Sequence, residues 1–209
     1  ALGDGLIIDH ARYLRTIDSF NPERRTVRVQ AGVVLDNLNK FLAPHGFQFG
    51  ADVATSSRAT LGGMIANNSS GARAPVYGTT VDHVRSLECV LADGRVVELV
   101  RDSETLAALR EEVDGAVAPY ADAIRERFHE GLVKRWPGFA LDDYLRHPGD
   151  LAKLVCGSEG TLAAITSAEL DVVPLPGARG LGCVFFSAVE EAMEATVSLL
   201  DLKPSAVEH

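Results

Sequence analysis

The sequence predicts an α+β fold in which a mostly antiparallel sheet is flanked by helices. Residues 27–31 alternate apolar and polar side chains, as a half-buried strand does, and residues 34–42 then change to helical spacing. The dipeptide Asp93-Gly94 is a strong hairpin signal between two apolar segments. Residues 188–202 carry apolar side chains at intervals of three and four, which is typical of one helix face.

Composition places the chain among ordinary globular proteins. It has 209 residues, 46% of them hydrophobic and 23% charged, which is enough to bury the core of one domain. The net charge of −9 argues against a nucleic-acid surface, where basic residues supply most of the affinity. No apolar run is long enough to cross a bilayer, so we expect no membrane span.

The three cysteines indicate a reducing compartment. Cys89, Cys156 and Cys183 form no Cys-x-x-Cys pair, so disulfide, iron–sulfur and metal sites have no support from them. Each stands among apolar residues and is predicted to be a small buried side chain. We therefore expect a cytoplasmic protein, with peripheral attachment at an inner membrane as the alternative.

The first half of the chain predicts the beginning of the sheet. Residues 6–8 form a short apolar run that we interpret as a buried strand, and residues 27–31 form the next strand. The helix over residues 34–42 would end at Gly46, since glycine favours helix termination. Residues 81–91 are predicted as a strand that returns through the Asp93-Gly94 turn to residues 96–99.

The second half alternates helices, a loop and short strands. Residues 102–104 can cap a helix that runs through Leu109, and a second helix covers residues 117–128. Residues 131–148 have little periodicity and are predicted as a loop. Short strands are predicted at 162–165, 168–173 and 183–186, with another beginning at 206–207; the apolar face of helix 188–202 is expected to lie in the core.

Residues 56–71, here called the first motif, are organised for binding. They combine hydroxyls, two adjacent glycines and two amides. Gly62 and Gly63 have no Cβ, so a ligand can approach the backbone closely. Leu61, Met64 and Ile65 would anchor the segment to a core. The alternative interpretation is a Ser- and Gly-rich loop that only connects two elements.

The order of these residues resembles the flavin-binding signature of the FAD-linked oxidase family, which includes vanillyl-alcohol oxidase. It is most similar to the branch of D-lactate, glycolate and D-2-hydroxyglutarate dehydrogenases, some of which are fused to iron–sulfur domains. In that branch Ser-Ser-x-x-Thr-Leu-Gly-Gly precedes Ala-Asn-Asn-Ser-x-Gly and Tyr-Gly, here residues 56–63, 66–71 and 77–78. Residues 157–166, here called the second motif, match the family's Gly-Ser-Glu-Gly-Thr-Leu-x-x-x-Thr.

The resemblance implies FAD as the cofactor. It implies that Thr60, Gly62 and Gly63 lie near the pyrophosphate, and that Asn67 and the Ser69–Gly71 turn lie near the isoalloxazine. The second motif would approach the FAD through its backbone, and Ile165 would lie near the nucleotide part. The candidate cofactor-binding residues are Ser56, Ser57, Thr60, Leu61, Gly62, Gly63, Asn67, Ser70, Gly71, Gly157, Glu159, Gly160 and Ile165.

Each part of this assignment has a structural alternative. Asn67 and Asn68 could form a turn by bonding to their own backbone. Residues 157–160 could be a tight turn between strands, and Tyr77-Gly78 could be plain packing. The family usually has Pro-Asp-Pro where this chain has Ala51-Asp52-Val53, so both neighbours of Asp52 depart from the family pattern.

The implied reaction is hydride transfer from a 2-hydroxy acid to FAD N5. We assign no catalytic residue and no metal ligand, because the family's catalytic histidine comes from a substrate domain that we expect beyond this chain. His10, His45, His129 and His147 are expected at the surface. Arg73 is the one arginine to watch near the flavin. The electron acceptor could be an iron–sulfur domain, a quinone or an electron-transfer protein.

We expect this sequence to be a fragment. In the family a glycine-rich loop that wraps the pyrophosphate directly precedes the Leu-Gly-Asp-Gly found here at residues 2–5. The predicted division is residues 1–50 for the remainder of a first FAD-binding subdomain, 51–203 for a second, and 204–209 for the start of the substrate domain. The alternatives are a flavin-carrying subunit completed by another chain and, less favoured, a flavoenzyme of cell-wall precursor reduction.

Overall fold

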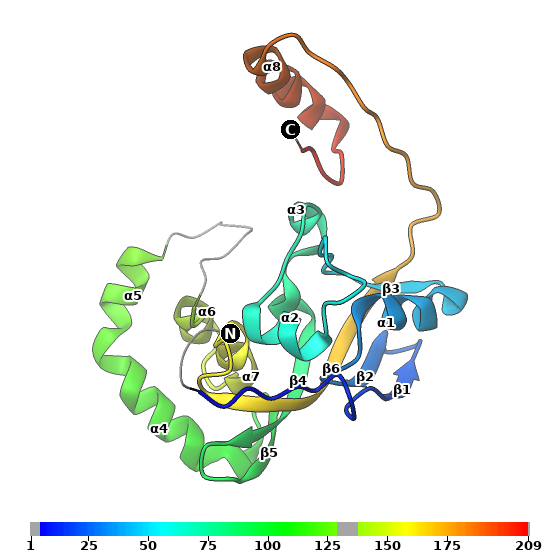
Figure 1. Cartoon of the computed structure of the whole chain (residues 1–209). Helices are drawn as coiled ribbons and strands as arrows, with labels where there is room; N and C mark the ends of the chain where they lie inside the picture. The colour runs from blue at the N-terminus through cyan, green and yellow to red at the C-terminus, as the bar shows by residue number, and fades with distance from the viewer. Residues whose placement is uncertain (1–4, 129–137, 209) are drawn as a thin grey trace.

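A computed structural model describes residues 5–128 and 138–208 (Figure 1). A six-stranded sheet forms the centre of the described part, with strand order β1-β2-β6-β4-β5 and β3 pairing with β6. Every strand pair is antiparallel. The α+β class and the mostly antiparallel sheet are confirmed. The strands are β1 (Ile17–Asn21), β2 (Thr26–Gln30), β3 (Phe47–Phe49), β4 (Val84–Leu91), β5 (Val96–Val100) and β6 (Ala163–Pro174).

Strand β6 is the longest and pairs with three others. It runs without interruption over 12 residues, where the sequence predicted two short strands. The prediction of a break was wrong because the polar residues in the middle have partners across the sheet. Thr166 Oγ1 donates to the Glu88 carbonyl oxygen at 3.0 Å, and the Ser167 hydroxyl accepts from Arg28 at 3.2 Å.

The described residues contain eight α-helices, and α8 lies apart from the sheet (Figure 1). They are α1 (Leu35–Leu42), α2 (Leu61–Asn67), α3 (Ala74–Tyr77), α4 (Ala107–Val117), α5 (Ala121–Arg127), α6 (Leu141–Arg146), α7 (Leu151–Val155) and α8 (Val189–Leu199). Short 3-10 turns accompany them: η1 (Ala43–His45), η2 (Thr80–His83), η3 (Glu104–Leu106), η4 (Ala118–Tyr120) and η5 (Leu200–Leu202).

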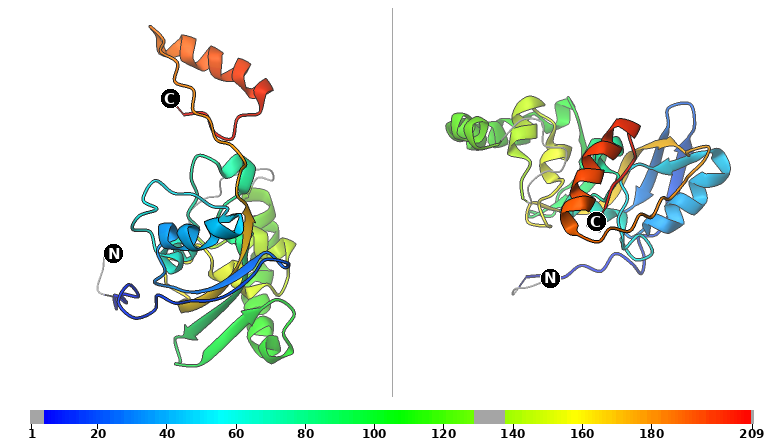
Figure 2. Two further views of the ribbon diagram at one scale, coloured as in Figure 1. Left: turned by 90° about the vertical axis from the view of Figure 1, so that its right-hand side faces the viewer. Right: turned by 90° about the horizontal axis from the view of Figure 1, so that it is seen from above.

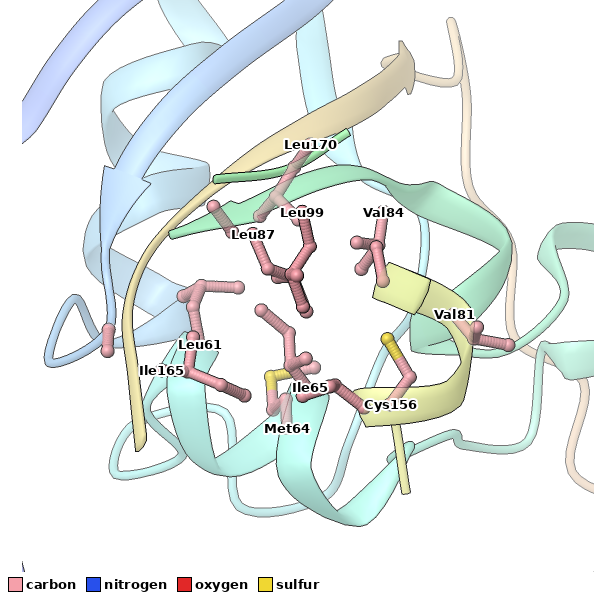
Figure 3. Close-up of a cluster of buried hydrophobic side chains, with 14 of the residues drawn as sticks. Leu61, Met64, Ile65, Val81, Val84, Leu87, Leu99, Cys156, Ile165 and Leu170 are labelled. Atoms are coloured by element: carbon pink, nitrogen blue, oxygen red, sulfur yellow. The ribbon is translucent and has the colours of Figure 1, made fainter. Parts of the chain in front are cut away.

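Helices α2 and α7 contribute side chains to the apolar core of the sheet. Leu61, Met64 and Ile65 of α2 are at most 1% exposed and lie beside Leu87 and Leu170 of the sheet (Figure 3). Burying side chains of this size stabilises the fold by about 1.5–3 kcal/mol each. The expectation that apolar residues anchor the first motif is therefore confirmed.

Several predicted elements are present. Strand β2, helix α1, and the hairpin of β4 and β5 occur near where the sequence placed them. The predicted start of β4 was wrong, because residues 81–83 belong to η2, which the capping box of Thr79 and Asp82 stabilises. Gly46 has φ +79° and ends η1, which continues α1 by one turn, so a glycine suits this position. The helices predicted over 104–128 are also present, as η3, α4, η4 and α5.

The predicted strand at residues 6–8 is absent. Leu6 is 88% exposed and Ile7 is 73% exposed, because this segment has no pairing strand and runs outside the sheet. The edge beside β2 is occupied by β1 instead, which the sequence did not predict. In the predicted loop at 131–148, residues 131–137 lie outside the described part, and residues 141–146 form α6.

Residues 180–208 form a separate arm that extends from the end of β6 (Figure 2). The strands predicted at 183–186 and 206–207 are absent among the described residues, and the face of α8 expected in the core is solvent-exposed. Cys183 is exposed, whereas Cys89 and Cys156 are buried as predicted. The sequence pattern correctly predicted an amphipathic helix, but no other described element covers the apolar face of α8.

Candidate functional site

The two motifs meet at the C-terminal end of α2. Asn67 Nδ2 donates to Glu159 Oε1 at 2.6 Å. The backbone N–H of Gly157 donates to the Ile65 carbonyl at 2.9 Å, and that of Glu159 donates to the Ala66 carbonyl at 2.8 Å. The Ile65 carbonyl also accepts from the C-cap Asn68 N–H at 3.1 Å, so the second motif adds a further donor to Ile65 and supplies one to Ala66 at the helix end. Helix α2 is thereby fixed to the segment that leads into β6.

The second motif makes a tight turn with left-handed backbone. Gly157, Glu159 and Gly160 have φ of +84°, +53° and +76°. A Cβ on Gly157 would lie 2.8 Å from the Gly138 carbonyl oxygen, so only glycine fits there. The turn interpretation of this motif is therefore correct for its backbone, and the turn exposes Glu159 and Gly160.

The backbone N–H groups in the first turn of α2 already have hydrogen-bond partners within the protein. Leu61 N–H donates to the Val33 carbonyl at 2.8 Å and Gly62 N–H donates to the Ala31 carbonyl at 2.7 Å. Gly63 N–H donates to Thr60 Oγ1 at 3.3 Å, so Thr60 is the N-cap. A Cβ on Gly62 would lie 2.7 Å from the Ala31 Cβ, which explains this glycine by packing.

A cavity of about 410 Å³ lies beside these elements. Six of the predicted residues line it: Thr60, Gly62, Gly63, Glu159, Gly160 and Ile165. The structure thus gathers both motifs around one cavity, a relationship that spacing in the sequence cannot show. The remaining lining residues are Leu6, Ile8, Asp9, His10, Ala11, Ala31, Ala66, Ala163 and Ala164.

The other predicted residues do not line this cavity. Leu61 is buried in the core. Ser56 and Ser57 belong to the turn before α2, where the Ser56 carbonyl accepts from the Asp36 N–H at 3.2 Å. Asn67 does not line the cavity, but it bonds to Glu159, which does. The three others, Ser70, Gly71 and Gly157, lie in the loops that follow α2 and α7.

Asp52 and Arg73 join the segment before the first motif to the loop after it. Arg73 Nε donates to Asp52 Oδ2 at 2.9 Å, and the guanidinium lies over the Tyr77 ring at 5.5 Å. A Cβ on Gly71 would lie 2.5 Å from the Asp52 carbonyl oxygen, so this glycine permits the close approach. His83, which is buried, bonds to the Tyr77 carbonyl at 2.8 Å and braces the same loop.

His10 is a cavity residue that the sequence interpretation placed at the surface. Its Nδ1 atom is buried and has no hydrogen-bond partner among the described residues. The only signal available in the sequence was its position two residues after the short apolar run at 6–8. The turn at residues 9–14 brings it to the cavity, and a turn of that kind is set by tertiary contacts.

The comparisons with known proteins agree with this geometry. Residues 1–100 match the profile of a family described as FAD binding domain. Over its whole length the chain is 38% identical to a D-2-hydroxyglutarate dehydrogenase of Pantoea ananatis and 34% identical to one of Escherichia coli. Residues 1–100 therefore match an FAD-binding domain. FAD is the cofactor of this domain.

The FAD-binding domain is also similar to more distant proteins. It is 26% identical to D-lactate dehydrogenase [cytochrome] 1, mitochondrial, of Saccharomyces cerevisiae over 95% of the chain. An alkyldihydroxyacetonephosphate synthase structure shares its fold, with TM-score 0.51 and 23% identity over 80% of the chain. The chain spans 22% of the length of the two D-2-hydroxyglutarate dehydrogenases, 27% of the yeast relative and 23% of the solved chain.

Part of the cavity suits the flat ring of a cofactor. Gly63 leaves room beside α2, and Leu6, Ile8 and Ile165 supply apolar surface for a ring. In the described part of the chain, no group of His, Cys, Asp and Glu is arranged to hold a metal ion, and no helix is long and apolar enough to cross a membrane.

Proposed function

We propose that this chain is the FAD-binding part of a flavin-dependent dehydrogenase of 2-hydroxy acids, of the D-lactate, glycolate or D-2-hydroxyglutarate type. One observation carries the proposal: the two motifs meet through Asn67 and Glu159, which are 92 residues apart, and both motifs line one cavity. The similarity to D-2-hydroxyglutarate and D-lactate dehydrogenases supports the substrate class. A cytoplasmic location is part of the same proposal.

The proposed roles follow the position of each residue. Thr60, Gly62 and Gly63 would lie along the pyrophosphate, and Ile165 along the nucleotide. Asn67, Ser70 and Gly71 would lie toward the isoalloxazine, with the Asn67 side chain oriented by Glu159. Ser56, Ser57, Leu61, Gly157 and Gly160 would shape the surrounding loops. Residues 1–50, 51–203 and 204–209 are the proposed first subdomain, second subdomain and start of a substrate domain.

The chemistry needs groups from outside this chain. FAD supplies the hydride acceptor, and the protein must hold the substrate carboxylate and remove the hydroxyl proton. The described residues bind and orient the cofactor, and none of them is assigned as the base. The reduced cofactor then needs an acceptor, which could be an iron–sulfur domain, a quinone or an electron-transfer protein.

Two measurements test the proposal. The visible absorption spectrum of the 209-residue chain, recorded after incubation with FAD and desalting, shows whether the cavity retains flavin. A longer polypeptide that contains this chain should then reduce a dye with D-lactate, glycolate or D-2-hydroxyglutarate, and fail with L-lactate and L-2-hydroxyglutarate. A flavin-loaded polypeptide that is inert toward all of these acids would overturn the substrate assignment.

A second candidate is a flavin-carrying subunit whose active site is completed by another chain. The exposed apolar arm, with Leu181 97% exposed and Phe185 90% exposed, favours a neighbour of some kind. The reading frame of the gene distinguishes the two. A stop codon soon after His209 would favour the subunit, and a long extension would favour a single-chain dehydrogenase.

A further inference from the structure

We propose that the cavity beside α2 holds the adenosine half of FAD, with the base against an open edge of β6 and the ribose at two carboxylates. This inference rests on the proposed function and assigns one part of the cofactor to one part of the site. Three observations carry it. Strand β6 lacks a partner on one side at the cavity, apolar side chains supply walls for a flat ring, and the lining contains carboxylates but no lysine or arginine.

Strand β6 has an open edge where it meets the cavity. On one side, residues 163–165 pair with β4. On the other side, pairing with β2 begins only at Ser167, and the last hydrogen bond runs from the Ala31 N–H to the Thr166 carbonyl at 2.9 Å. In the described part of the chain, no group bonds to residues 163–165 from that side. The edge is therefore available to a ligand.

An open strand edge offers the donor and the acceptor that adenine needs. Successive residues of an antiparallel strand direct their N–H and C=O groups to opposite sides, so three consecutive residues present at least one such pair to the cavity. Ala163, Ala164 and Ile165 all line the cavity, and Ala164 is partly exposed. Adenine carries an amino donor and ring-nitrogen acceptors, which match a backbone C=O and N–H.

The walls of the cavity suit the faces of a flat base. Leu6, Ile8 and Ile165 supply apolar surface. The only atom within 4 Å of a Cβ built on Gly63 is Thr60 Oγ1, so there is space beside the start of α2. The volume of about 410 Å³ is typical of a small-molecule site. A heterocycle can thus bury its faces here while its edge bonds to β6.

The acidic lining suits ribose and opposes phosphate. Asp9 and Glu159 are exposed and line the cavity. One oxygen of Asp9 accepts from the Ala11 N–H and one oxygen of Glu159 accepts from Asn67, while the second oxygen of each has no hydrogen-bond partner among the described residues. A carboxylate only accepts hydrogen bonds, so it matches the hydroxyls of ribose. The pyrophosphate must then lie away from both carboxylates.

The isoalloxazine of FAD is a poorer match to this cavity. The residues proposed to lie toward it, Asn67, Ser70 and Gly71, are not part of the lining. Reduction of the flavin places negative charge on its pyrimidine edge, and two nearby carboxylates would disfavour that charge. The adenosine half carries no such charge, so the lining favours it.

The test compares three nucleosides that differ in one group each. Kd is measured by titration calorimetry with the 209-residue chain for adenosine, inosine and 2′,3′-dideoxyadenosine, with FAD as the reference ligand. Inosine has a carbonyl oxygen in place of the amino donor, so we expect it to bind about 10-fold or more weakly than adenosine. Dideoxyadenosine lacks both ribose hydroxyls and should bind about 5-fold or more weakly, because hydrogen bonds to charged groups are lost.

A double variant tests the two carboxylates. Asp9→Asn combined with Glu159→Gln keeps the size of both side chains, removes both charges and retains an oxygen that accepts from Asn67. It should reduce the difference between adenosine and dideoxyadenosine to less than about 2-fold and leave the difference between adenosine and inosine unchanged, because the base bonds to the backbone. Glu126→Gln, at an exposed site on α5, is the matched control and should change no Kd. The melting temperature of each variant shows whether it is folded.

The failure of this inference and that of the proposed function can be distinguished. If the chain binds FAD but binds adenosine no better than inosine, the base does not lie at the edge of β6, and the proposed function stands without this inference. If the folded double variant still prefers adenosine over dideoxyadenosine to the same extent, the carboxylates do not hold the ribose. If the chain binds neither FAD nor adenosine, the proposed function fails together with this inference.

Discussion

Asn67 Nδ2 lies 2.6 Å from Oε1 of Glu159, so a side chain at the end of α2 bonds to one in the turn before β6. The carbonyl oxygen of the same amide accepts from Ser69 Oγ at 3.0 Å. Both polar atoms of the Asn67 side chain therefore have partners within the protein. Asn67 orders the loop that follows α2 and connects it to the second motif.

Replacing Glu159 should loosen this connection. Glu159→Ala removes the acceptor of Asn67, and we expect the free energy of unfolding to fall by about 1 kcal/mol because Glu159 is exposed. FAD affinity should fall several-fold, since the two motifs line one cavity. Urea unfolding and FAD titration measure both effects. Glu126→Ala, at an exposed site on α5, is the control and should change neither.

Gly157 should not tolerate a side chain. Gly157→Ala places a Cβ 2.8 Å from the Gly138 carbonyl oxygen at φ +84°, and we expect a loss of about 2 kcal/mol or more in urea unfolding. Gly115→Ala is the matched control, because Gly115 is in α4 with open space around it. That change should stabilise the chain by about 0.5–1 kcal/mol. Equal effects of the two substitutions would contradict the described turn.

Acid should weaken an ion pair that crosses the sheet. Arg28 donates to both Glu98 carboxylate oxygens, at 2.9 and 2.8 Å, and Ser86 Oγ donates to Oε1 at 2.8 Å. The hydrogen bond from Arg28 is the main cause that holds the pKa of Glu98 below its ordinary value of 4.5, while burial opposes it. A carboxyl group whose pKa is lowered by folding stabilises the protein fully at pH values above its ordinary pKa. This contribution is lost as the pH falls through the lowered pKa.

Glu98→Gln should therefore make unfolding less sensitive to acid. The side chain of Glu98 is 37% exposed, so we expect the pair to contribute less than about 1 kcal/mol. Urea unfolding between about pH 2 and pH 6, on either side of the ordinary pKa, measures the difference in slope. Glu126→Gln on α5 serves as the control. A parallel decline in the unaltered chain and in Glu98→Gln would contradict a role for this pair.

Thiol labelling should report on the arm. Burial raises the pKa of Cys89 to about 12 and that of Cys156 still further, while Cys183 is exposed. The reactive species is the thiolate, so the folded 209-residue chain should show a single fast thiol with a disulfide reagent. Cys183→Ser should abolish that phase.

The same thiol tests what covers the arm in a longer polypeptide. Val184, Phe185 and Phe186 follow Cys183 and are exposed, and α8 presents Val189 and Val197 to solvent in the same way. If further chain packs on this surface, Cys183 should react at least about 10-fold more slowly there, because burial excludes the reagent. Fast labelling in both polypeptides would show that the arm stays uncovered.

The local sequence pattern was sufficient to predict the elements that belong to the sheet or bury one face against it. Strand β2, helix α1 and the β4–β5 hairpin follow from alternation, helical spacing and the Asp93-Gly94 turn. The same reasoning was wrong at residues 6–8 and 183–186, where apolar runs have no strand to pair with among the described residues. An apolar run predicts that a segment will be buried, but it does not predict which other segment will pack against it.

The candidate site shows the same division between sequence and fold. By itself the sequence determined which residues form the two motifs, the α+β class and the resemblance to FAD-linked oxidases. Only the tertiary structure decided that Asn67 bonds to Glu159, that the N–H of Gly62 is committed to Ala31, and that His10 lines the cavity. The physical reason is that each of these contacts joins residues far apart along the chain, and contacts between distant residues leave no local signal in the sequence.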